Sequence, residues 1–587
     1  MGGDIGRVIP RETVRAAWAA NPSGTPAMWI RDRLAGVFSE KDFTGWYPAD
    51  GRRGLSPVTL ALVSVLQFAE NLTDRQAALA VRCRIDWKYC LGLELTDPGF
   101  DHSVLSEFRD RMAQDDRADR LLAVMVQRLV EAGLIKQRGR IRTDSTHVLA
   151  AVRKLNRVEL VGETLRVALE ELAAADEDWL ATVMTPEWAG RYARPVRYDR
   201  LPRGKDELAV HVLQIGRDGM RVLEAVHAVG VRQRLRDLPG VQVLRQVWVQ
   251  QYWTDQHGDL AWRAAKSSRD RQSRHGRPRR SSSADGEEQA DTIAARVPWS
   301  GVEIVSPHDP EARYCRKEGK STTKAEWVGY RDHQSETCEE GVPNVIVHVV
   351  TRPAPVQDID AVEDIHAGLT ACGLIPDEHL VDTGYLTPDL IHHTAQRWGI
   401  ALIGPVRADP RGRPGFTKED FHVNWEDHTV TCPRGVTSPP WKPTLGDGKP
   451  RLSVLFPRAA CRACPDRAAC TGDANGKGRH LTLLPEPLQK IQTLNRADQQ
   501  SQPWKARYAL RAGCEATVSE TTRAHGLRNC RYKGLAKTHV QHVLTAAGTN
   551  IIRLADCYTP GIVPDRPPRP VSQLQRLCRR LSAQTPQ

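Results

Sequence analysis

The sequence lacks any hydrophobic run long enough to cross a membrane as a helix. Its longest apolar stretch, TLALVSVLQFA over residues 59–69, is about half of the ~20 residues that a membrane-spanning helix needs. The N-terminal stretch MGGDIGRVIPRETVRAA contains no apolar segment followed by a cleavage site, so no secretory signal peptide is expected. These two absences predict a soluble, cytoplasmic protein with no membrane partner.

Cysteine is sparse, and no export signal accompanies it. The chain has 13 cysteines among 587 residues, which indicates a reducing compartment rather than a disulfide-stabilised scaffold. Hydrophobic residues make up 40% of the chain and charged residues 26%, the proportions of a soluble globular protein. A chain of this length is expected to form roughly three or four domains.

Acidic residues are few in the C-terminal part of this basic chain. Residues 501–587 hold 14 Lys and Arg against 4 Asp and Glu, and the whole chain has a formal charge of +12. A basic surface of this kind attracts phosphate groups, and salt weakens that attraction. Residues 505–537 interleave their charges with apolar helical positions, which favours a folded surface that binds a polyanion. Residues 563–587 are typical of a solvated basic tail.

Helical patterns fill the N-terminal part of the chain. Ser56 followed by Pro57 is a good helix start, and Thr73 with Gln76 has the spacing of a capping box. Short helices with tight connections occur in helix-turn-helix proteins that bind DNA, although they more often form only a packed bundle. We therefore predict a helical N-terminal domain with DNA binding as a candidate role.

Strand-like runs begin with GRIRTDSTHVLA and return much later in the chain, which predicts a mixed α/β sheet built from separated segments. The later runs are AEWVGYRDHQSETC, NVIVHVVTRP, EHLVDTGYL and IALIGPV. The predicted organisation is an N-terminal helical domain (1–135), a sheet core (136–150, 300–410 and 500–556), a helical insertion (151–299) with a flexible linker (266–291), a cysteine-rich insertion (411–499) and a basic disordered tail (557–587).

Three carboxylates stand where such a core would bring them together. Asp144 is expected at the end of the first strand, Asp382 follows the strand EHLV, and Glu515 lies on a later helix. Hard oxygen ligands of this kind suit Mg²⁺ or Mn²⁺, and two such ions can clamp the attacking and leaving oxygens of a phosphoryl displacement. Each residue also has a simpler interpretation: the aspartates as ordinary turn residues, and Glu515 as an exposed helix acid paired with Arg511.

The spacing Tyr508-x2-Arg511-x3-Glu515 resembles the tyrosine-arginine-glutamate part of a signature found in a large group of DDE-type bacterial insertion-sequence transposases. That signature ends with a lysine seven residues beyond the glutamate, where this chain has Thr522 with Arg523 beside it. TDSTHV, LVDTGYL and the helices after Glu515 resemble the same family, as does the N-terminal leader from residue 56. The resemblance covers most of the chain except residues 150–300 and the tail.

The resemblance implies a ribonuclease-H-like core and a reaction. Asp144, Asp382 and Glu515 would hold two Mg²⁺ ions (or Mn²⁺), water would attack the phosphodiester at each element end, and the freed 3′-hydroxyl would attack target DNA. Arg511, Arg523 and Lys537 are candidates for phosphate contacts. The implied partners are element ends with inverted repeats, target DNA, and a second copy of the chain in a homodimer or higher assembly. The cysteine-rich insertion would then precede the last catalytic helix.

Four cysteines form a cluster that suggests a second metal. Cys432, Cys461, Cys464 and Cys470 lie in TCPRG and CRACPDRAACT, and they supply enough thiolates for a closed tetrahedral zinc site. A β-hairpin would return Cys432 to the other three. The zinc would be structural, stapling an insertion with little core of its own. The alternative is four reduced structural cysteines.

Three other functions remain open on the sequence. The tripeptide Asp382-Thr383-Gly384 occurs in aspartic proteases, but such enzymes need two such carboxylates, and a dimeric protease would not explain Glu515 and its basic helix. A transposase-derived, non-catalytic DNA-binding protein is a second alternative. A metal-dependent nuclease without strand transfer is the third.

Overall fold

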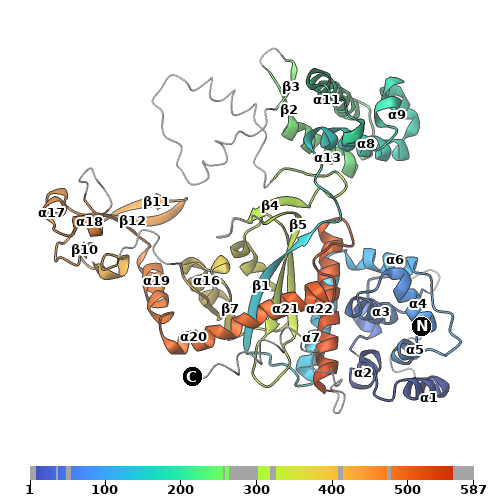
Figure 1. The fold of residues 1–587 in the computed structure, drawn as a ribbon, viewed down its shortest axis with the longest axis horizontal. Coiled ribbons are helices and arrows are strands. Elements are labelled where there is room, and N and C mark those ends of the chain that lie inside the picture. The colour runs from blue at the N-terminus through green and yellow to red at the C-terminus, as the bar shows by residue number, and fades with distance from the viewer. Residues whose placement is uncertain are drawn as a thin grey trace, which may run out of the picture.

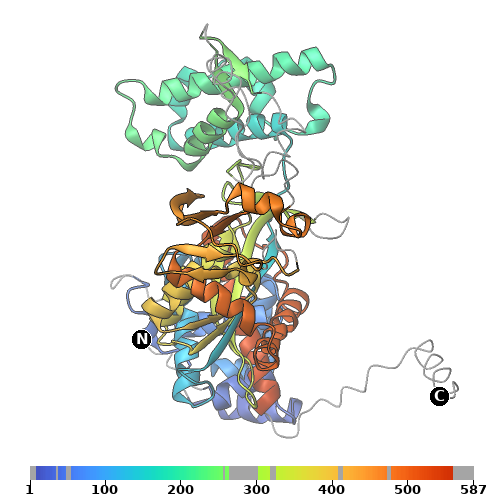
Figure 2. The same cartoon turned by 90° about the vertical axis from the view of Figure 1, so that its left-hand side faces the viewer.

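The computed structural model describes residues 8–34, 37–47, 54–255, 258–263, 302–317, 325–407, 414–471 and 478–558. The predicted linker at 266–291 lies outside the described residues, as does the predicted tail beyond residue 558. No helix in these ranges is both long enough and apolar enough to pass through a membrane. Figures 1 and 2 show a central sheet with helices on both faces, a helical unit beyond one end, and a smaller β-rich unit beside it.

The centre of the molecule is a six-stranded mixed sheet with β1 in its middle. The order is β4-β5-β1-β7-β8. β6 also pairs with β5, beyond the part of β5 that pairs with β4. β1 runs antiparallel to β5 and parallel to β7, and β7 runs parallel to β8. The strands are β1 (Arg140–Leu149), β4 (Arg313–Lys317), β5 (Ala325–Thr337), β6 (Ile346–Pro353), β7 (Glu378–Leu380) and β8 (Ala401–Ile403). The mixed α/β prediction is confirmed.

The helices that complete this core come from distant parts of the chain. They are α15 (Val362–Ala371), α16 (Pro388–Trp398), α19 (Glu486–Asp498), α20 (Gln502–Ala509), α21 (Gly513–Arg523) and α22 (Leu535–Tyr558), with 3₁₀ turns η4 (Asp358–Ala361), η5 (Thr383–Tyr385) and η7 (Leu510–Ala512). α21 packs against β1, while α22 packs against β6. Of these C-terminal helices, α21 therefore lies on the strand that carries Asp144 (Figure 1).

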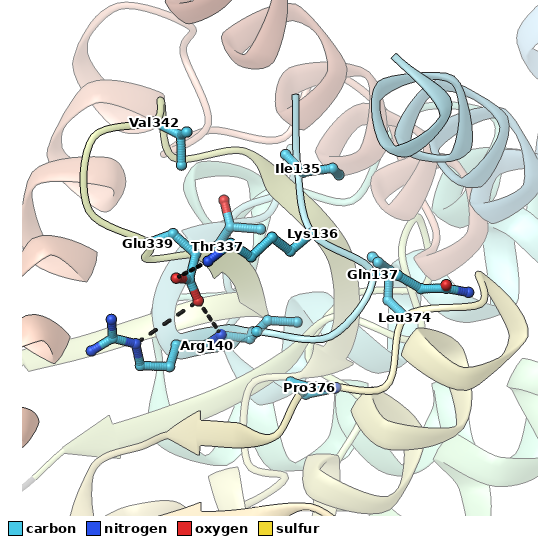
Figure 3. Close-up of a pocket in the computed structure, with 11 residues that line it drawn as sticks. Ile135, Lys136, Gln137, Arg140, Thr337, Glu339, Val342, Leu374 and Pro376 are labelled. Carbon is cyan, nitrogen blue, oxygen red and sulfur yellow. Dashed lines mark hydrogen bonds and ion pairs between the residues drawn. The ribbon is translucent and has the colours of Figure 1, made fainter. Parts of the chain in front are cut away.

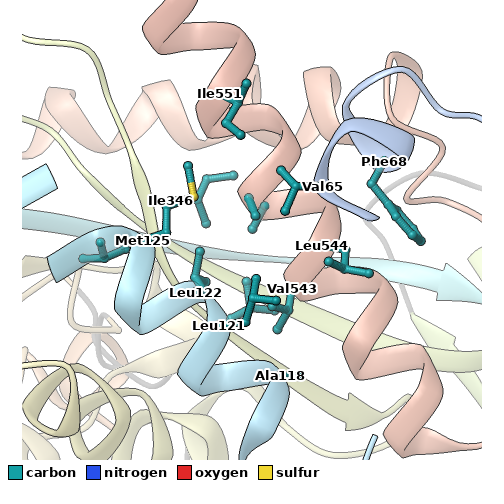
Figure 4. Close-up of a cluster of buried hydrophobic side chains, with 14 of the residues drawn as sticks. Val65, Phe68, Ala118, Leu121, Leu122, Met125, Ile346, Val543, Leu544 and Ile551 are labelled. Atoms are coloured by element: carbon teal, nitrogen blue, oxygen red, sulfur yellow. The ribbon is translucent and has the colours of Figure 1, made fainter. Parts of the chain in front are cut away.

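The N-terminal helices share one hydrophobic core with the sheet. The helices that contribute to it are α2 (Pro26–Arg33), α3 (Pro57–Ala69), α4 (Asp74–Cys83), α5 (Ile85–Leu91), α6 (Ser103–Met112) and α7 (Arg117–Glu131), with the turn η1 (Glu40–Phe43). Helix α1 (Arg11–Ala20) packs in a small separate cluster with residues of α2 and α5. Figure 4 shows Val65 of α3, Leu122 of α7, Ile346 of β6 and Leu544 of α22 meeting in this core. Such burial stabilises each side chain by roughly 1.5–3 kcal/mol. The predicted helix starts at Ser56 and Thr73 are both confirmed as caps.

The segment between β1 and β4 forms a helical unit with its own core. It contains α8 (Arg157–Ala175), α9 (Glu177–Val183), α10 (Glu187–Tyr192), η2 (Tyr198–Arg200), α11 (Lys205–His227), α12 (Gln233–Arg236), α13 (Pro239–Gln251) and the hairpin β2 (Tyr252–Thr254) and β3 (Leu260–Trp262). Its buried apolar side chains form a cluster separate from that of the sheet. In both views this helical unit stands at one end of the molecule (Figures 1 and 2).

The segment between β8 and α19 is rich in short strands. It contains η6 (Lys418–Asp420), β9 (His422–Asn424), β10 (Thr429–Thr431), β11 (Lys442–Gly446), β12 (Lys449–Leu455), α17 (Arg458–Ala463), α18 (Arg467–Cys470) and β13 (His480–Leu483). β9 pairs with β10, and β11, β12 and β13 form a three-stranded antiparallel sheet. Its core is small, with six fully buried apolar side chains.

Buried histidines link β1 to β7 and α15. His379 Nε2 lies 2.7 Å from the Thr143 hydroxyl, and its Nδ1 lies 2.8 Å from His366 Nε2. Burial lowers the pKa of His366 to about 4, and burial with the neighbouring His366 lowers the pKa of His379 well below its usual value. Both rings are therefore neutral in the folded protein at neutral pH.

This pair predicts loss of stability in mild acid. Below pH ~6.5 the unfolded chain binds protons that the folded histidines do not, so the free energy of unfolding falls as the pH drops towards 4. For His366 the loss between pH 7 and pH 5.5 is about 1 kcal/mol. Urea unfolding at several pH values should show a shallower pH dependence for His366→Gln than for the unchanged protein. His227→Gln, at an exposed site on α11, should keep the original dependence; equal slopes in all three proteins would contradict the prediction.

Candidate functional site

Parallel pairing of β1 with β7 brings Asp144 and Asp382 to the same level of the sheet. Arg142 pairs with Leu380, and each aspartate lies two residues further along its own strand. We expected Asp144 at the end of its strand, but β1 continues for five more residues to Leu149. The reason is pairing with β5, whose residues 329–333 lie opposite residues 145–149. Asp382 does follow its strand, and it caps the turn η5.

Arg511 places its guanidinium beside both aspartates. Its Nη2 lies 2.9 Å from Asp144 Oδ1 and 3.9 Å from Asp382 Oδ2. Only 15% of the Arg511 side chain is exposed. Burial raises the pKa of Asp144, the charges of Asp382 and Asp358 raise it further, and the Arg511 guanidinium opposes them. The two carboxylates thus form an anionic site, with Asp144 largely buried and Asp382 partly exposed, that already holds the Arg511 cation.

Asp358 is a third carboxylate of this site, and the sequence analysis did not identify it. It lies in η4, directly after the loop that follows β6. Asp358 accepts hydrogen bonds from the Ser145 hydroxyl (2.9 Å) and from Arg331 Nη1 (2.6 Å). A Cβ added to Gly384 would lie 2.9 Å from Asp382 Oδ1 and 3.1 Å from Asp358 Oδ2. The missing side chain at Gly384 therefore leaves room for both carboxylates.

Glu515 lies one helical turn after Arg511 but does not join the aspartates. Its side chain on α21 is exposed, and among the described residues it makes no hydrogen bond or ion pair. Within the same ranges, no group of three or more His, Cys, Asp or Glu side chains is arranged to hold a metal ion. The structure therefore brings together Asp144 and Asp382 of the predicted set, whereas Glu515 stays outside this pair, four residues after Arg511 in the chain.

Glu520 has a structural partner instead. Arg553 of α22 binds its Oε2 at 2.7 Å and reaches the fully buried Glu336 at 2.9 Å. Arg142 completes the network, since its Nε donates to Glu336 at 2.8 Å and its Nη1 to the Leu510 carbonyl at 2.5 Å. This network fixes α21 over β1, so Glu520 serves to hold the helix that carries Glu515.

The helix that carries Glu515 also depends on a glycine. A Cβ added to Gly513 would lie 2.1 Å from Arg142 Nη1, closer than any real contact. Arg142 is itself buried and held by Glu336 and Leu510, so it has little freedom to move away. The first residue of α21 therefore has to be small for the helix to approach β1.

The three predicted phosphate-binding cations differ in their surroundings. Arg511 is enclosed by the aspartates, as described above. Arg523 is exposed at the end of α21, and no ion pair to it is found within the described residues. Lys537 Nζ lies 2.6 Å from Asp110 Oδ1 in an exposed ion pair between α22 and α6. Exposed pairs of this kind stabilise a protein by less than about 1 kcal/mol, so phosphate can compete for Lys537.

The four predicted cysteines line one cavity of the β-rich segment. Cys432 follows β10, Cys461 lies in α17, Cys464 follows α17, and Cys470 ends α18. The β11–β12 hairpin lies in the chain between Cys432 and the other three cysteines. Burial raises the pKa of Cys470, Arg479 opposes this, and the other three cysteines raise it further, which shows that all four are near one another. The side chains as they stand are not arranged around a metal position.

A small pocket lies at the other end of β1 and is separate from the carboxylates (Figure 3). Glu339 accepts from the Arg140 backbone N–H at 2.7 Å and from Lys136 Nζ at 3.2 Å. Burial raises the pKa of Glu339, but these hydrogen bonds and the two nearby cations outweigh burial and lower it. These contacts tie the start of β1 to the end of β5, which is a structural role.

Two parts of the chain match known families. Residues 431–555 match the family described as "Transposase DDE domain", and residues 21–111 match "Transposase domain (DUF772)". The first match contains Glu515 and all four cysteines, and neither match reaches Asp144 or Asp382. No curated protein and no solved structure matches the chain.

Proposed function

We propose that this chain is a DDE-type insertion-sequence transposase, as its two family matches support. From this premise, it cleaves the ends of its element and joins them to target DNA. The observation that carries this proposal is the pair Asp144 and Asp382, which lie at one level of adjacent parallel strands with the Arg511 cation beside both. An anionic site of this kind suits a reaction in which cations neutralise charge on phosphate.

The strand arrangement supports a ribonuclease-H-like core. Three successive antiparallel strands, β1, β5 and β6, are followed by β7 and β8, which add in parallel on the other side of β1. One helix, α15, connects β6 to β7, and another, α16, connects β7 to β8. In the proposed core the helical insertion follows the first strand, and the cysteine-rich insertion precedes α21.

The residues at this site fit divalent cations. Asp144 and Asp382 supply hard oxygen ligands, and the structure shows that a positive group is accommodated between them. Glu515 is the third ligand in this proposal, because it stands at the glutamate of the family signature and its side chain is free. When bound, Mg²⁺ or Mn²⁺ would supply the charge that stabilises the attacking and leaving oxygens of the phosphodiester.

The protein's own residues then orient the reactants. Asp358 holds Ser145 and Arg331, so the backbone next to Asp144 keeps its position. Arg511, whose charge is no longer needed by the aspartates once metal binds, can donate to a phosphate oxygen at the same place. Cleavage forms a bond from a water oxygen to phosphorus and releases the 3′ oxygen as a hydroxyl. In the joining step that hydroxyl attacks a target phosphodiester, forming a new bond to phosphorus and releasing the target strand's own 3′ oxygen as a hydroxyl.

DNA and a second copy of the chain are the proposed partners. Arg523 and Lys537 extend the basic surface beyond the site and are proposed to contact the phosphate backbone. Because two element ends have to be joined to one target, a homodimer or higher assembly on DNA is proposed. The cysteine cluster is proposed to bind one structural Zn²⁺, since four sulfur donors converge on one cavity.

Transposition in cells tests the choice between the two glutamates of α21. A marked element with its native flanking DNA would be supplied with the unchanged protein, with Glu515→Gln or with Glu520→Gln. Glu515→Gln is expected to abolish excision and reinsertion, because the third carboxylate is lost. Glu520→Gln should still move the element at equal protein level, because glutamine keeps an oxygen that can accept from Arg553.

The other outcomes separate the alternatives. Full movement with Glu515→Gln would show that the third ligand is assigned wrongly. Preserved DNA binding without movement by the unchanged protein would favour the non-catalytic DNA-binding protein. Cleavage without reinsertion would favour a metal-dependent nuclease.

A further inference from the structure

A groove separates the helical insertion from the sheet core, and cations from three distant segments line it. Arg153 follows β1, Arg197 lies between α10 and α11, and Lys533 precedes α22, with Ser306 and His308 at its floor. Lys533 belongs to the core, whereas Arg197 belongs to the insertion. The groove is therefore two-sided, and each wall contributes a basic side chain.

The acidic residues beneath this groove are already neutralised. Glu159 accepts from Arg153 at 2.7 Å and from the Tyr198 backbone N–H at 2.8 Å. Glu163 accepts from the Val196 backbone N–H and pairs with Arg166 and His308, each contact being 2.9 Å.

Both glutamates are nearly inaccessible, with 2% and 4% of Glu159 and Glu163 exposed. Burial raises the pKa of Glu163, but the hydrogen bonds from His308, Arg166 and the Val196 N–H lower it to about 2. The two carboxylates thus use their charge to hold the groove walls, and they have none left for a ligand.

Two cations of the groove remain without a partner. Arg197 and Lys533 are exposed, and within the described residues neither side chain forms an ion pair or hydrogen bond. Arg153 adds a third cation, which is paired with the buried Glu159. A concave surface with unpaired cations on both walls fits the phosphate backbone of a nucleic acid.

We infer that this groove binds the phosphate backbone of the duplex on which the carboxylate site acts, so that the helical insertion clamps DNA against the core. This inference rests on the proposed function. The path between the two places is β1 itself, which runs from Asp144 to Leu149 and then into Ala151 at the groove. Seven residues span at most ~23 Å when fully extended, which corresponds to about 7 base pairs of duplex at 3.4 Å each.

Salt dependence of DNA binding tests the groove. Fluorescence anisotropy with a duplex carrying the element end, in EDTA, would compare the unchanged full-length chain with Arg197→Gln/Lys533→Gln. Each phosphate contact contributes about 0.9 to the slope of log K against log salt, so the slope of the double variant should be smaller by about 1.8. The gain in affinity between 1 M and 0.1 M salt should therefore be roughly 60-fold smaller for the double variant than for the unchanged protein. The control Arg217→Gln/Arg221→Gln removes two exposed cations of α11 outside the groove and should change neither quantity.

Neutral substitutions in the DNA backbone locate the phosphate that the groove contacts. Methylphosphonate groups placed one at a time along the duplex should weaken binding of the unchanged protein at about 7 base pairs from the cleaved phosphodiester. The double variant should be insensitive at that position, because its contact is already gone. Equal sensitivity of both proteins, or an unchanged salt slope, would overturn the inference.

Cleavage is recorded on the same duplex so that the two proposals fail separately. An altered slope without any cleavage by the unchanged protein would count against the proposed function and leave the groove supported. Cleavage with an unaltered slope in the double variant would count against the groove alone. Because both substituted side chains are exposed and unpaired, the single variants Arg197→Gln and Lys533→Gln should fold and should each lose about 0.9 of slope.

Discussion

Asp144→Asn is expected to reduce cleavage of an element-end duplex by ~10³-fold or more while the protein still binds that duplex. A divalent metal stabilises the transition state of phosphoryl transfer by several kcal/mol, and each 1.36 kcal/mol is tenfold in rate. Asparagine keeps the shape of the side chain and one acceptor oxygen for Arg511, so the fold should be retained. The measurement is single-turnover cleavage with Mg²⁺, next to anisotropy with the same duplex in EDTA.

Two further variants serve as comparisons for Asp144→Asn. Asp358→Asn should reduce cleavage by only ~10–100-fold, the usual effect of removing a residue that orients a metal ligand, because Asp358 holds Ser145 and Arg331. Asp377→Asn, at an exposed site just before β7, should leave cleavage unchanged. Cleavage by Asp144→Asn equal to that of Asp377→Asn would contradict the assignment of the site, and loss of DNA binding would contradict the stated reason.

The pairing of the two aspartates was accessible from sequence because it depends on strand order. Carboxylates at the ends of two strand-like runs are expected to lie close together when the two strands are neighbours. The parallel register of β1 and β7 shows that these strands are neighbours. The end of β1 was predicted too early, because polar and apolar residues alternate only weakly from Ser145 to Leu149. These residues take their strand conformation from pairing with β5. Tertiary pairing decides strand ends where the local pattern is ambiguous.

The contacts that cross the chain could not be predicted in the same way. Asp358 reaches the site because η4 packs against η5, and neither turn carries a pattern that indicates the contact. Arg511 was predicted to bind phosphate, yet its place between two carboxylates depends on how η7 docks against β1. The roles of Glu515 and Glu520 differ only because Arg553, more than thirty residues further on, reaches Glu520.

Substitution of one cysteine of the cluster is expected to abolish zinc binding and to loosen the fold of the cysteine-rich segment. Purified protein is expected to contain one zinc per chain by elemental analysis. Cys461→Ser and Cys464→Ser should each abolish zinc binding, because the loss of one thiolate opens a four-sulfur site. Cys83→Ser, at an exposed position on α4, should keep the full content. Zinc-free unchanged protein would contradict the site and leave four reduced structural cysteines.

The physical reason for a large effect is the size of this segment's own core. Among the described residues its buried apolar side chains include Phe421 and Phe456, which pack against each other. Cys432, Cys461 and Cys470 lie at the edge of that cluster. A core so small supplies little stability by itself, whereas structural zinc contributes ~10–16 kcal/mol in small peptides. Limited proteolysis of Cys461→Ser should therefore cut between residues 414 and 483 at protease levels that leave Cys83→Ser intact. Because α22 and the sheet keep a separate core, thermal unfolding of the rest should change little. A matching loss there would show that the cysteine-rich segment supports the whole fold.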